Sequence, residues 1–272
     1  MKKSIFISIL LCSTLYAGML ERQKHLADSL FAAGDYFNAV TEYSRLEYFD
    51  NRNDYTFIAN FKIGLAYKYG SLLDNALKAF AKSLLKAGTD KEKITAKEEI
   101  VKINILRRDT DKAHQYLNEL AKDINYSEND LSYWRGWTFM FQDKWDLAAL
   151  EFGKIKIDHE LKIFCESVNN DKYSVTLAQI LSYILPGSGQ FYTGNYLSGL
   201  MSLGWNVLCG YTTVNAFVEE RVFDGLMVGN LLWLRFYRGN NQNAEKFAVQ
   251  KNTEIVNQAY RYLKNSYKGL KP

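Results

Sequence analysis

The chain has 272 residues and few side chains whose types and spacing could support catalysis or metal binding. Its histidines, His25, His114 and His159, lie far apart, with no Cys, Asp or Glu at the spacing of a metal site. The GxSxG, HExxH and Walker patterns are missing from the sequence. We therefore expect a protein that is not an enzyme and that uses no metal or cofactor.

The glycine-rich stretch GSGQFYTG at residues 187–194 lacks the Gly-Lys-Ser/Thr ending and the preceding strand of a phosphate-binding loop. A preceding proline ends a helix, and glycines permit backbone angles that other residues resist, so the stretch predicts a tight chain reversal. Its glutamine can satisfy carbonyl groups freed by the break, and its tyrosine suits a membrane boundary. The residues of this predicted turn motif are Pro186, Gly187, Gly189, Gln190, Tyr192 and Gly194.

The turn motif lies inside an uncharged run. Tyr173–Val218 contains no Asp, Glu, Lys or Arg, although 24% of the chain is charged. As a helix, Leu197–Val218 is long enough to cross about 30 Å of hydrocarbon alone, whereas Ser174–Leu185 fits a re-entrant or interfacial segment. A third apolar segment, Gly225–Leu234, is also short. These segments predict a hydrophobic helical hairpin in a membrane.

The turn sequence PGSGQFYTGNYLSG is followed by Asn206, by YRGN at residues 237–240, and by Ala244 and Asn252. This arrangement resembles a C-terminal membrane region that recurs in uncharacterised bacterial envelope proteins. A shorter form, PGxGxxYxG, is similar to the opening of the two-helix TM2-type membrane domains. The resemblance implies a place in the bacterial cell envelope and carries no chemistry with it.

Two charged segments adjoin the apolar ones. The cluster Glu219-Glu220-Arg221 could be functional inside a membrane, but the cost of burying charge favours a loop in water. From Arg235 to the C-terminus basic residues far outnumber acidic ones, and a net charge of only +4 gives no reason to expect nucleic acid as a partner. If the first domain is periplasmic, the positive-inside rule places this basic tail in the cytoplasm and requires an odd number of crossings.

Residues 21–157 carry a repeated helical pattern that must position any binding surface in this half. Ala39, Ala76, Ala113 and Ala148 recur at intervals close to a period of about 34 residues. The clearest copy is FKIGLAYKYGSLLDNALKAFAKSL, and the third copy is degenerate. The pattern resembles the tetratricopeptide repeats, which implies an α-solenoid of about four helical hairpins.

In tetratricopeptide proteins the first helices of the repeats line a peptide-binding groove. The resemblance assigns this role to Phe61, Leu65, Tyr69, Tyr133, Trp137 and Phe141, and so implies an apolar, aromatic groove for a protein or peptide partner. The alternative is that these side chains only pack against one another or against the C-terminal half.

Residues 1–17 have the pattern of a secretory signal peptide, with Lys2 and Lys3 before an uncharged run and small residues at its end. An uncleaved anchor helix and lipidation at Cys12 are the alternatives. Beyond this segment the chain has Cys165 and Cys209, for which we expect no disulfide.

These features together predict an all-α protein, a TPR-like solenoid followed by a hydrophobic helical membrane domain. The expected parts are a signal peptide (1–17), the repeat domain (18–157), a connector (158–172), the membrane-associated domain (173–240) and a basic helical tail (241–272).

The expected function is a non-enzymatic, membrane-anchored envelope scaffold that binds a protein or peptide partner through the groove and touches membrane lipid. The alternative is a membrane-protein assembly or transport accessory in which the hairpin is the active part, and an enzyme at the membrane surface is the least favoured. The expected location is the inner membrane with the repeat domain in the periplasm, with the outer membrane left open.

Overall fold

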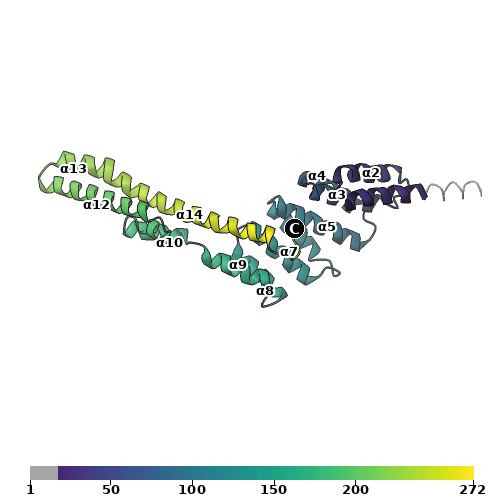
Figure 1. The fold of residues 1–272 in the computed structure, drawn as a ribbon. Coiled ribbons are helices and arrows are strands. Elements are labelled where there is room, and N and C mark those ends of the chain that lie inside the picture. Colours follow the sequence, from purple (N-terminus) through teal and green to yellow (C-terminus); the bar gives the residue numbers. More distant parts are fainter. Residues whose placement is uncertain (1–17) are drawn as a thin grey trace, which may run out of the picture. The chain divides into compact units, whose positions relative to one another are not determined.

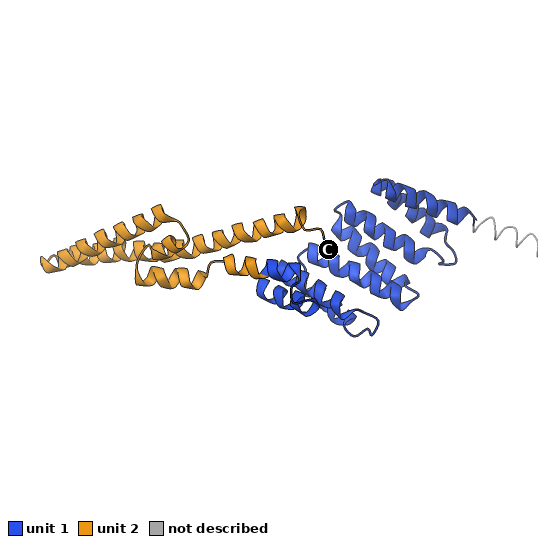
Figure 2. Ribbon diagram, turned by 60° about the horizontal axis from the view of Figure 1, so that its bottom comes forward, with its two compact units in different colours: residues 1–165, 269–272 blue, residues 166–268 orange. Residues whose placement is uncertain are grey.

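The computed structural model describes residues 18–272, which form helices and no β-strand (Figure 1). The predicted signal peptide, residues 1–17, lies outside the described residues. The chain divides into two compact units, one that ends at Cys165 and also takes in Gly269–Pro272, and one formed by Glu166–Lys268 (Figure 2).

Unit 1 is a solenoid of helix pairs. A helix over residues 18–32 pairs with α2, and α3 pairs with α4, α5 with α6, and α7 with α8. The bounds are α2 (Tyr36–Phe49), α3 (Thr56–Tyr69), α4 (Leu73–Lys86), α5 (Asp90–Leu106), α6 (Thr110–Leu120), α7 (Glu128–Phe141), α8 (Trp145–Ile155) and α9 (Glu160–Asp171), within which the unit ends. The predicted all-α fold with repeated helix pairs is confirmed.

The helices of a pair approach closely because small residues face aromatic ones. A methyl group added at Gly64 would lie 2.6 Å from the ring of Phe80, and one added at Gly136 would lie 2.6 Å from the ring of Phe152. The repeated alanines named above are all fully buried. These contacts explain the sequence period, since each pair must leave the same space for the ring that fills it.

Each turn within a pair uses one residue in the left-handed region. These residues are Gly34 (φ 79°), Ser71 (φ 62°), Arg108 (φ 59°) and Asp143 (φ 62°). Only the first is glycine, so the three later copies carry a strained residue at the same structural position.

A buried group of charges joins neighbouring pairs. Glu99 of α5 accepts hydrogen bonds from Lys68 of α3 at 2.9 Å and from Lys102 at 2.7 Å. Burial alone would raise the pKa of the Glu99 carboxyl, but the two ammonium groups outweigh it and hold this pKa below its usual value. Lys102 also lies 4.7 Å from the ring centroid of Trp134 on α7, so the second, third and fourth pairs are linked.

Unit 2 contains a short helical segment followed by a long helical hairpin. Its further helices are α10 (Val175–Ile184), α11 (Ser188–Tyr192), α12 (Tyr196–Val218), α13 (Val222–Val228), the π-helical turn η1 (Gly229–Trp233) and α14 (Leu234–Asn265). The chain descends along α12, reverses at Glu219–Arg221, and returns along α13, η1 and α14, which pack against α12. We call residues 196–240 the hairpin. It is not the hairpin predicted around Pro186–Gly194, because α10 packs mainly against α11 and α14 and α12 packs mainly against its own return limb.

Among the helices from residue 18 onward, none combines the length and the apolar character needed to cross a membrane. The prediction that Leu197–Val218 crosses by itself is therefore not supported. The helix α12 has 23 residues, but Asn206, Thr213 and Asn215 interrupt its apolar sequence.

Candidate functional site

The predicted turn motif folds around a buried glutamine. The side chain of Gln190, on α11, is fully buried and donates from Nε2 to both the Oδ1 and the backbone oxygen of Asn240, at 2.9 and 3.1 Å. Its Oε1 accepts from the hydroxyl of Ser182 at 3.2 Å. The sequence led us to expect that Gln190 satisfies carbonyl groups of the broken helix, whereas the carbonyl that it satisfies belongs to α14.

Asn240 closes this network from the other end of unit 2. Its Oδ1 also accepts from the backbone N–H of Gly187 at 2.8 Å, and its Nδ2 donates to the backbone oxygen of Ser182 at 3.1 Å. One asparagine thus holds the end of α10, the turn and α11 together. Sequence reasoning did not select Asn240 as a site residue, although the YRGN segment that contains it was part of the resemblance.

The glycines of the turn are required by space as well as by conformation. Gly187 has φ 96°, in the left-handed region, and an added methyl group there would lie 2.3 Å from the backbone oxygen of Gly199. Gly189 has no positive φ, but an added methyl group would lie 2.2 Å from the backbone oxygen of Ala178 and 2.7 Å from Cβ of Ala244. The turn is therefore a packed structure in which α10, α11 and α14 meet.

The other residues of the predicted motif lie around this network. Pro186 follows α10 and is partly buried. Tyr192 is also partly buried, and its hydroxyl accepts a hydrogen bond from the backbone N–H of Ser174, outside the network. Gly194 has φ 77° and is exposed. Farther along α14, Asn252 exchanges two hydrogen bonds with the backbone of Tyr173, at 2.7 and 2.9 Å, and so ties the start of the segment to α14.

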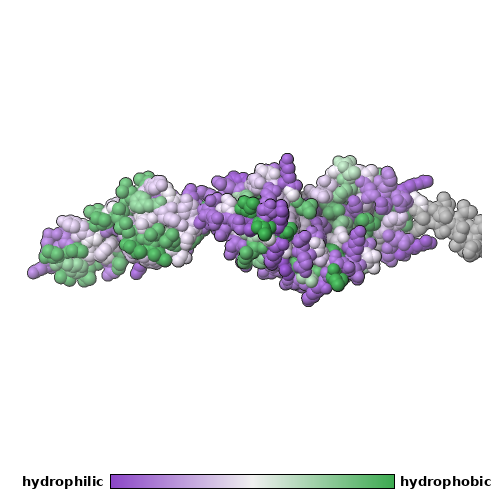
Figure 3. All heavy atoms as spheres, turned by 90° about the horizontal axis from the view of Figure 1, so that it is seen from below, coloured by the Kyte–Doolittle hydropathy of each residue, from purple (hydrophilic) through white to green (hydrophobic). Residues whose placement is uncertain are grey.

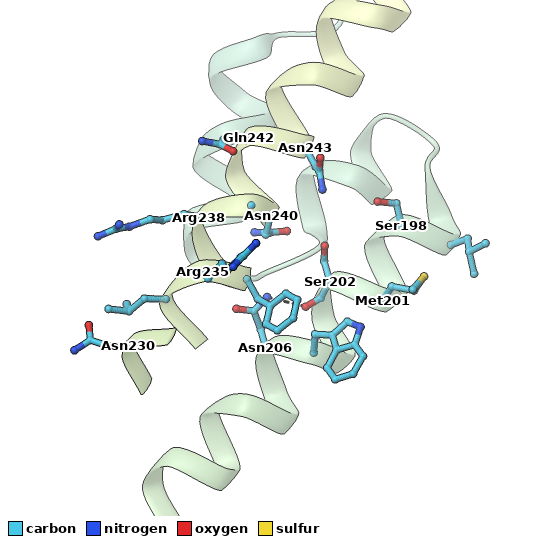
Figure 4. A pocket seen from close by; sticks show the side chains of 15 residues that line it. Ser198, Met201, Ser202, Asn206, Asn230, Arg235, Arg238, Asn240, Gln242 and Asn243 are labelled. Atoms are coloured by element: carbon cyan, nitrogen blue, oxygen red, sulfur yellow. Dashed lines mark hydrogen bonds between the residues drawn. The ribbon is translucent and has the colours of Figure 1, made fainter. Parts of the chain in front are cut away.

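A cleft of about 760 Å³ opens beside the network, between α12 and the return limb of the hairpin. Figure 4 shows Ser198, Met201, Ser202 and Asn206 on α12 opposite Arg235, Arg238, Asn240, Gln242 and Asn243 on α14. The rings of Trp205 and Phe236, both in the cleft wall, stack with centroids 5.4 Å apart and planes inclined by 9°. The cleft therefore combines amide and hydroxyl groups with an apolar wall.

Two features of the cleft have chemical consequences. No acidic residue lines it, and within residues 18–272 neither Arg235 nor Arg238 forms an ion pair. Asn206 is only 5% exposed, donates from Nδ2 to the backbone oxygen of Ser202 at 2.8 Å, and leaves its Oδ1 without a partner. The cleft thus offers positive charge and one buried hydrogen-bond acceptor, an arrangement that suits an anion carrying an N–H or O–H group.

The predicted groove residues of unit 1 have different environments. Trp137 is 3% exposed and is part of the core, whereas Tyr69 is 57% exposed and stacks on Tyr36 with ring centroids 5.6 Å apart. Phe61 and Leu65 are partly buried around Phe80. The packing alternative thus describes Trp137, and an open surface is found at Tyr69.

Tyr133 and Phe141 lie on α7, at the other end of the predicted groove. The hydroxyl of Tyr133 donates to the backbone oxygen of Leu270, so the last residues of the chain lie against this position. Phe141 is partly buried and its ring centroid is 6.4 Å from that of Trp137. The C-terminal residues were not expected here, because the basic tail was predicted to be a segment separate from the repeats.

The side chains first considered for chemistry stay apart. Among residues 18–272 no group of three His, Cys, Asp or Glu side chains could hold a metal ion, and both Cys165 and Cys209 are buried. The ring of His159 stacks on Phe152 and that of His114 lies against Phe139, and burial lowers the pKa of both imidazoles. The cluster at Glu219–Arg221 is an exposed turn.

No family model matches the chain, and neither a curated protein nor a solved structure is similar to it.

Proposed function

We propose that this chain is a membrane-attached helical-repeat scaffold, held at the membrane by the hairpin of unit 2 and presenting unit 1 to a protein or peptide partner. The observation that carries the proposal is the inverted distribution of side chains in the hairpin. In a protein that folds in water, large apolar side chains are buried and polar ones face the solvent. The hairpin has the opposite arrangement.

The buried face of α12 is small or polar, and its exposed faces are apolar. The buried residues are Gly199, Asn206, Cys209, Thr213 and Ala216. The exposed large apolar residues of the hairpin include Leu197, Leu200, Met201, Trp205, Leu208, Val214, Phe217, Phe223, Leu226 and Leu231. Figure 3 shows this apolar surface in green, toward the hairpin end of the molecule at the left. Small and polar contacts between helices with apolar residues outside are typical of helices packed in lipid.

The polar residues that lower the hydropathy of α12 are shielded within the hairpin. Thr213 donates to the backbone oxygen of Cys209 at 2.7 Å, and Asn206 donates to that of Ser202, so these groups are bonded to their own helix. The return limb covers the same face. Lipid would therefore contact a surface more apolar than the average of α12, and helices that pack as a pair bury their polar groups from lipid.

The reversal at the hairpin tip is charged and suits water. Arg221 forms ion pairs with Glu219 at 2.7 Å and with Asp224 at 3.5 Å, and all three side chains are about half exposed. Charged residues at membrane depth are costly, so the proposal leaves this tip in an aqueous or headgroup layer.

The hairpin returns the chain to the side from which it came. Gly269–Pro272 belong to unit 1, where the backbone of Leu270 accepts a hydrogen bond from Tyr133. A hairpin that enters and leaves the membrane on one side would give an even number of crossings, in place of the odd number predicted from the positive-inside rule. We propose a bacterial envelope location in which the repeats and the C-terminus share one side of the membrane, with the periplasm as the side that an export signal would give.

An aromatic cluster at one end of unit 1, in which Tyr69 is exposed and the other two rings are partly buried, supports partner binding. Tyr69, Tyr36 and Phe31 form a three-ring cluster, with centroids between 5.6 and 5.9 Å apart. Lys62 lies 4.9 Å from the centroid of Phe31. Aromatic clusters that remain accessible are common anchors for a peptide.

Membrane attachment is tested by flotation of the full-length protein with phospholipid vesicles. Leu208 is 51% exposed near the middle of α12, and Leu208→Asp is expected to reduce vesicle binding about 100-fold, because aspartate in place of leucine costs about 3 kcal/mol at bilayer depth. Leu150 is 64% exposed in the middle of α8, so Leu150→Asp makes the same change outside the hairpin and should float as the wild type does. Equal flotation of the two variants would refute the proposal.

The alternative function, an assembly or transport accessory in which the hairpin is the active part, is favoured by the exposed apolar surface itself. Photo-crosslinking residues placed at Tyr69 and at Leu208 of the full-length protein in membranes separate the two functions. The scaffold function gives protein adducts from Tyr69 and lipid adducts from Leu208, whereas an assembly accessory gives protein adducts from Leu208.

A further inference from the structure

We infer that the cleft between α12 and α14 binds the headgroup of a phospholipid, with the lipid phosphate beside Arg235 and a headgroup N–H or O–H at Asn206. This inference rests on the proposed function, because it supplies the lipid that the hairpin would meet. It adds a specific site, a chemical class of ligand and the residues that recognise it.

The charge of the cleft selects for an anion. Arg235 and Arg238 lie one helical turn apart, form no ion pair within residues 18–272, and face no acidic residue in the cleft. The nearest carboxylate along α14, that of Glu245, accepts a hydrogen bond from Gln179 instead. Figure 4 shows Arg235 beside Asn206, while Arg238 extends outward from the rim, so Arg235 is the direct ligand and Arg238 adds positive charge. Arginine binds phosphate oxygens with particularly favourable geometry.

The buried acceptor selects for a donor on the same ligand. The Nδ2 of Asn206 is bonded to Ser202, while its Oδ1 has no partner although the residue is almost fully buried in the cleft wall. An unpartnered buried acceptor is costly, and a ligand N–H or O–H removes that cost. Ethanolamine and glycerol headgroups carry such donors, and choline does not.

The wall of the cleft selects for an amphiphile. Trp205 and Phe236 stack at its edge, and Leu197, Met201 and Leu234 complete its apolar side. These residues continue into the exposed apolar surface of the hairpin, on which acyl chains would lie. A free phosphate ion would leave this wall in water, so a lipid explains more of the cleft than an inorganic anion does.

The Gln190–Asn240 network holds the cleft in shape. Asn240 lines the cleft, but its side-chain atoms are already bonded to Gly187, Gln190 and Ser182. Asn240 therefore positions α14 and leaves recognition to Asn206 and the arginines.

Native mass spectrometry of the full-length protein in a phosphate-free detergent solution tests the inference. The ligands are the dioctanoyl forms of phosphatidylglycerol, phosphatidylethanolamine and phosphatidylcholine, together with inorganic phosphate. The phosphatidylglycerol and phosphatidylethanolamine lipids are expected to bind about fivefold more tightly than phosphatidylcholine, and Asn206→Leu should abolish that difference. The double variant Arg235→Gln, Arg238→Gln should weaken phosphatidylglycerol binding about 100-fold. Arg261→Gln, an exposed change on the same helix outside the cleft, should leave binding unchanged.

Equal binding of the three lipids, or wild-type affinity in the Asn206→Leu and arginine variants, would overturn the inference, provided that circular dichroism shows these variants folded. Inorganic phosphate that binds as tightly as phosphatidylglycerol, with the same arginine dependence, would overturn the lipid assignment and leave an anion site. Flotation keeps the two proposals separate. If the wild type floats but the cleft variants bind lipid normally, only this inference fails, and if short-chain lipid binds as expected without flotation, only membrane attachment fails.

Discussion

The substitution Gly189→Ala tests the packed turn most directly, because it adds one methyl group where the structure has no space. That methyl group would meet the backbone oxygen of Ala178 at 2.2 Å, the hydroxyl of Ser182 at 2.4 Å and Cβ of Ala244 at 2.7 Å. Two of these neighbours belong to α10 and one to α14, so the strain cannot be relieved by moving a single flexible side chain.

The expected loss of stability has three parts. Overpacking of a close contact costs about 1–3 kcal/mol. Displacing Ser182 weakens the bond it accepts from the backbone N–H of Gly189 and the bond it donates to Gln190, at about 1 kcal/mol each. Alanine regains up to about 1 kcal/mol of helix propensity in α11. The net expectation is a destabilisation of about 3 kcal/mol, or a roughly 100-fold rise in the open population.

Hydrogen–deuterium exchange of the peptide covering residues 174–192 measures this change without requiring both units to unfold together. Gly204→Ala is the matched control, since Gly204 lies in the middle of α12 and an added methyl group there meets nothing within 4 Å. This control should stabilise α12 by up to about 1 kcal/mol. If Gly189→Ala leaves exchange at residues 174–192 unchanged, the turn is loose and the reasoning about its packing is wrong.

Three further predictions concern unit 1. Ser71→Gly should stabilise the repeats by up to about 1 kcal/mol, because it removes the backbone strain of a serine in the left-handed region. Ser44→Gly, within α2, should destabilise them. Thermal unfolding should therefore shift upward for the first variant and downward for the second. Burial lowers the pKa of His114 and His159, so the folded state favours neutral imidazoles. The stability that these two side chains contribute is complete above pH about 6.5 and is lost as the pH falls below that value. Changing both histidines to Gln should therefore make the thermal unfolding temperature depend less on pH between 7.5 and 5.5. Trp137→Ala should lower the free energy of unfolding by about 3–5 kcal/mol and Tyr69→Ala by much less. Of these two variants, only Tyr69→Ala should reduce recovery of a partner while the protein stays folded. If Tyr69→Ala is instead the more destabilising change, Trp137 is a groove residue.

The repeat architecture was predictable because its cause is local and recurs. Each helix pair has a small residue opposite an aromatic ring, as Gly64 opposite Phe80 shows. Because every pair has the same requirement, small residues recur along the sequence at a regular interval. Burial of individual groove positions was not predictable in the same way. Tyr69 and Phe141 occupy equivalent positions, each five residues after the glycine of its helix, but Tyr69 is exposed and Phe141 is partly buried, so the shared position does not decide how far each is covered.

The candidate site was predictable only in part. The turn was recognisable because proline and glycine act through the local backbone, and Gly187 has the left-handed conformation that glycine favours. The partner of Gln190 was not predictable, because Asn240 lies on another helix and nothing in the sequence distinguishes it from the other asparagines nearby. The cleft was missed for the same reason: Asn206 and Arg235 come together only once the return limb packs against α12.

The odd-crossing prediction and the paired packing of α12 lead to different proposed topologies, and the difference bears on function. The odd-crossing prediction counted the apolar segments one by one and placed the basic tail by the positive-inside rule, whereas α13, η1 and α14 form the covering partner of α12. A polar residue such as Asn206 is costly on a lone helix in lipid, whereas in the hairpin it faces protein and the cleft. The same pairing that makes the hairpin apolar outside therefore places, at its base, an acceptor and an arginine that have no partner among residues 18–272. Because Asn240 fixes α14 against the turn through three bonded partners, this pair of groups is held in place before any ligand arrives, which lowers the entropic cost of binding one.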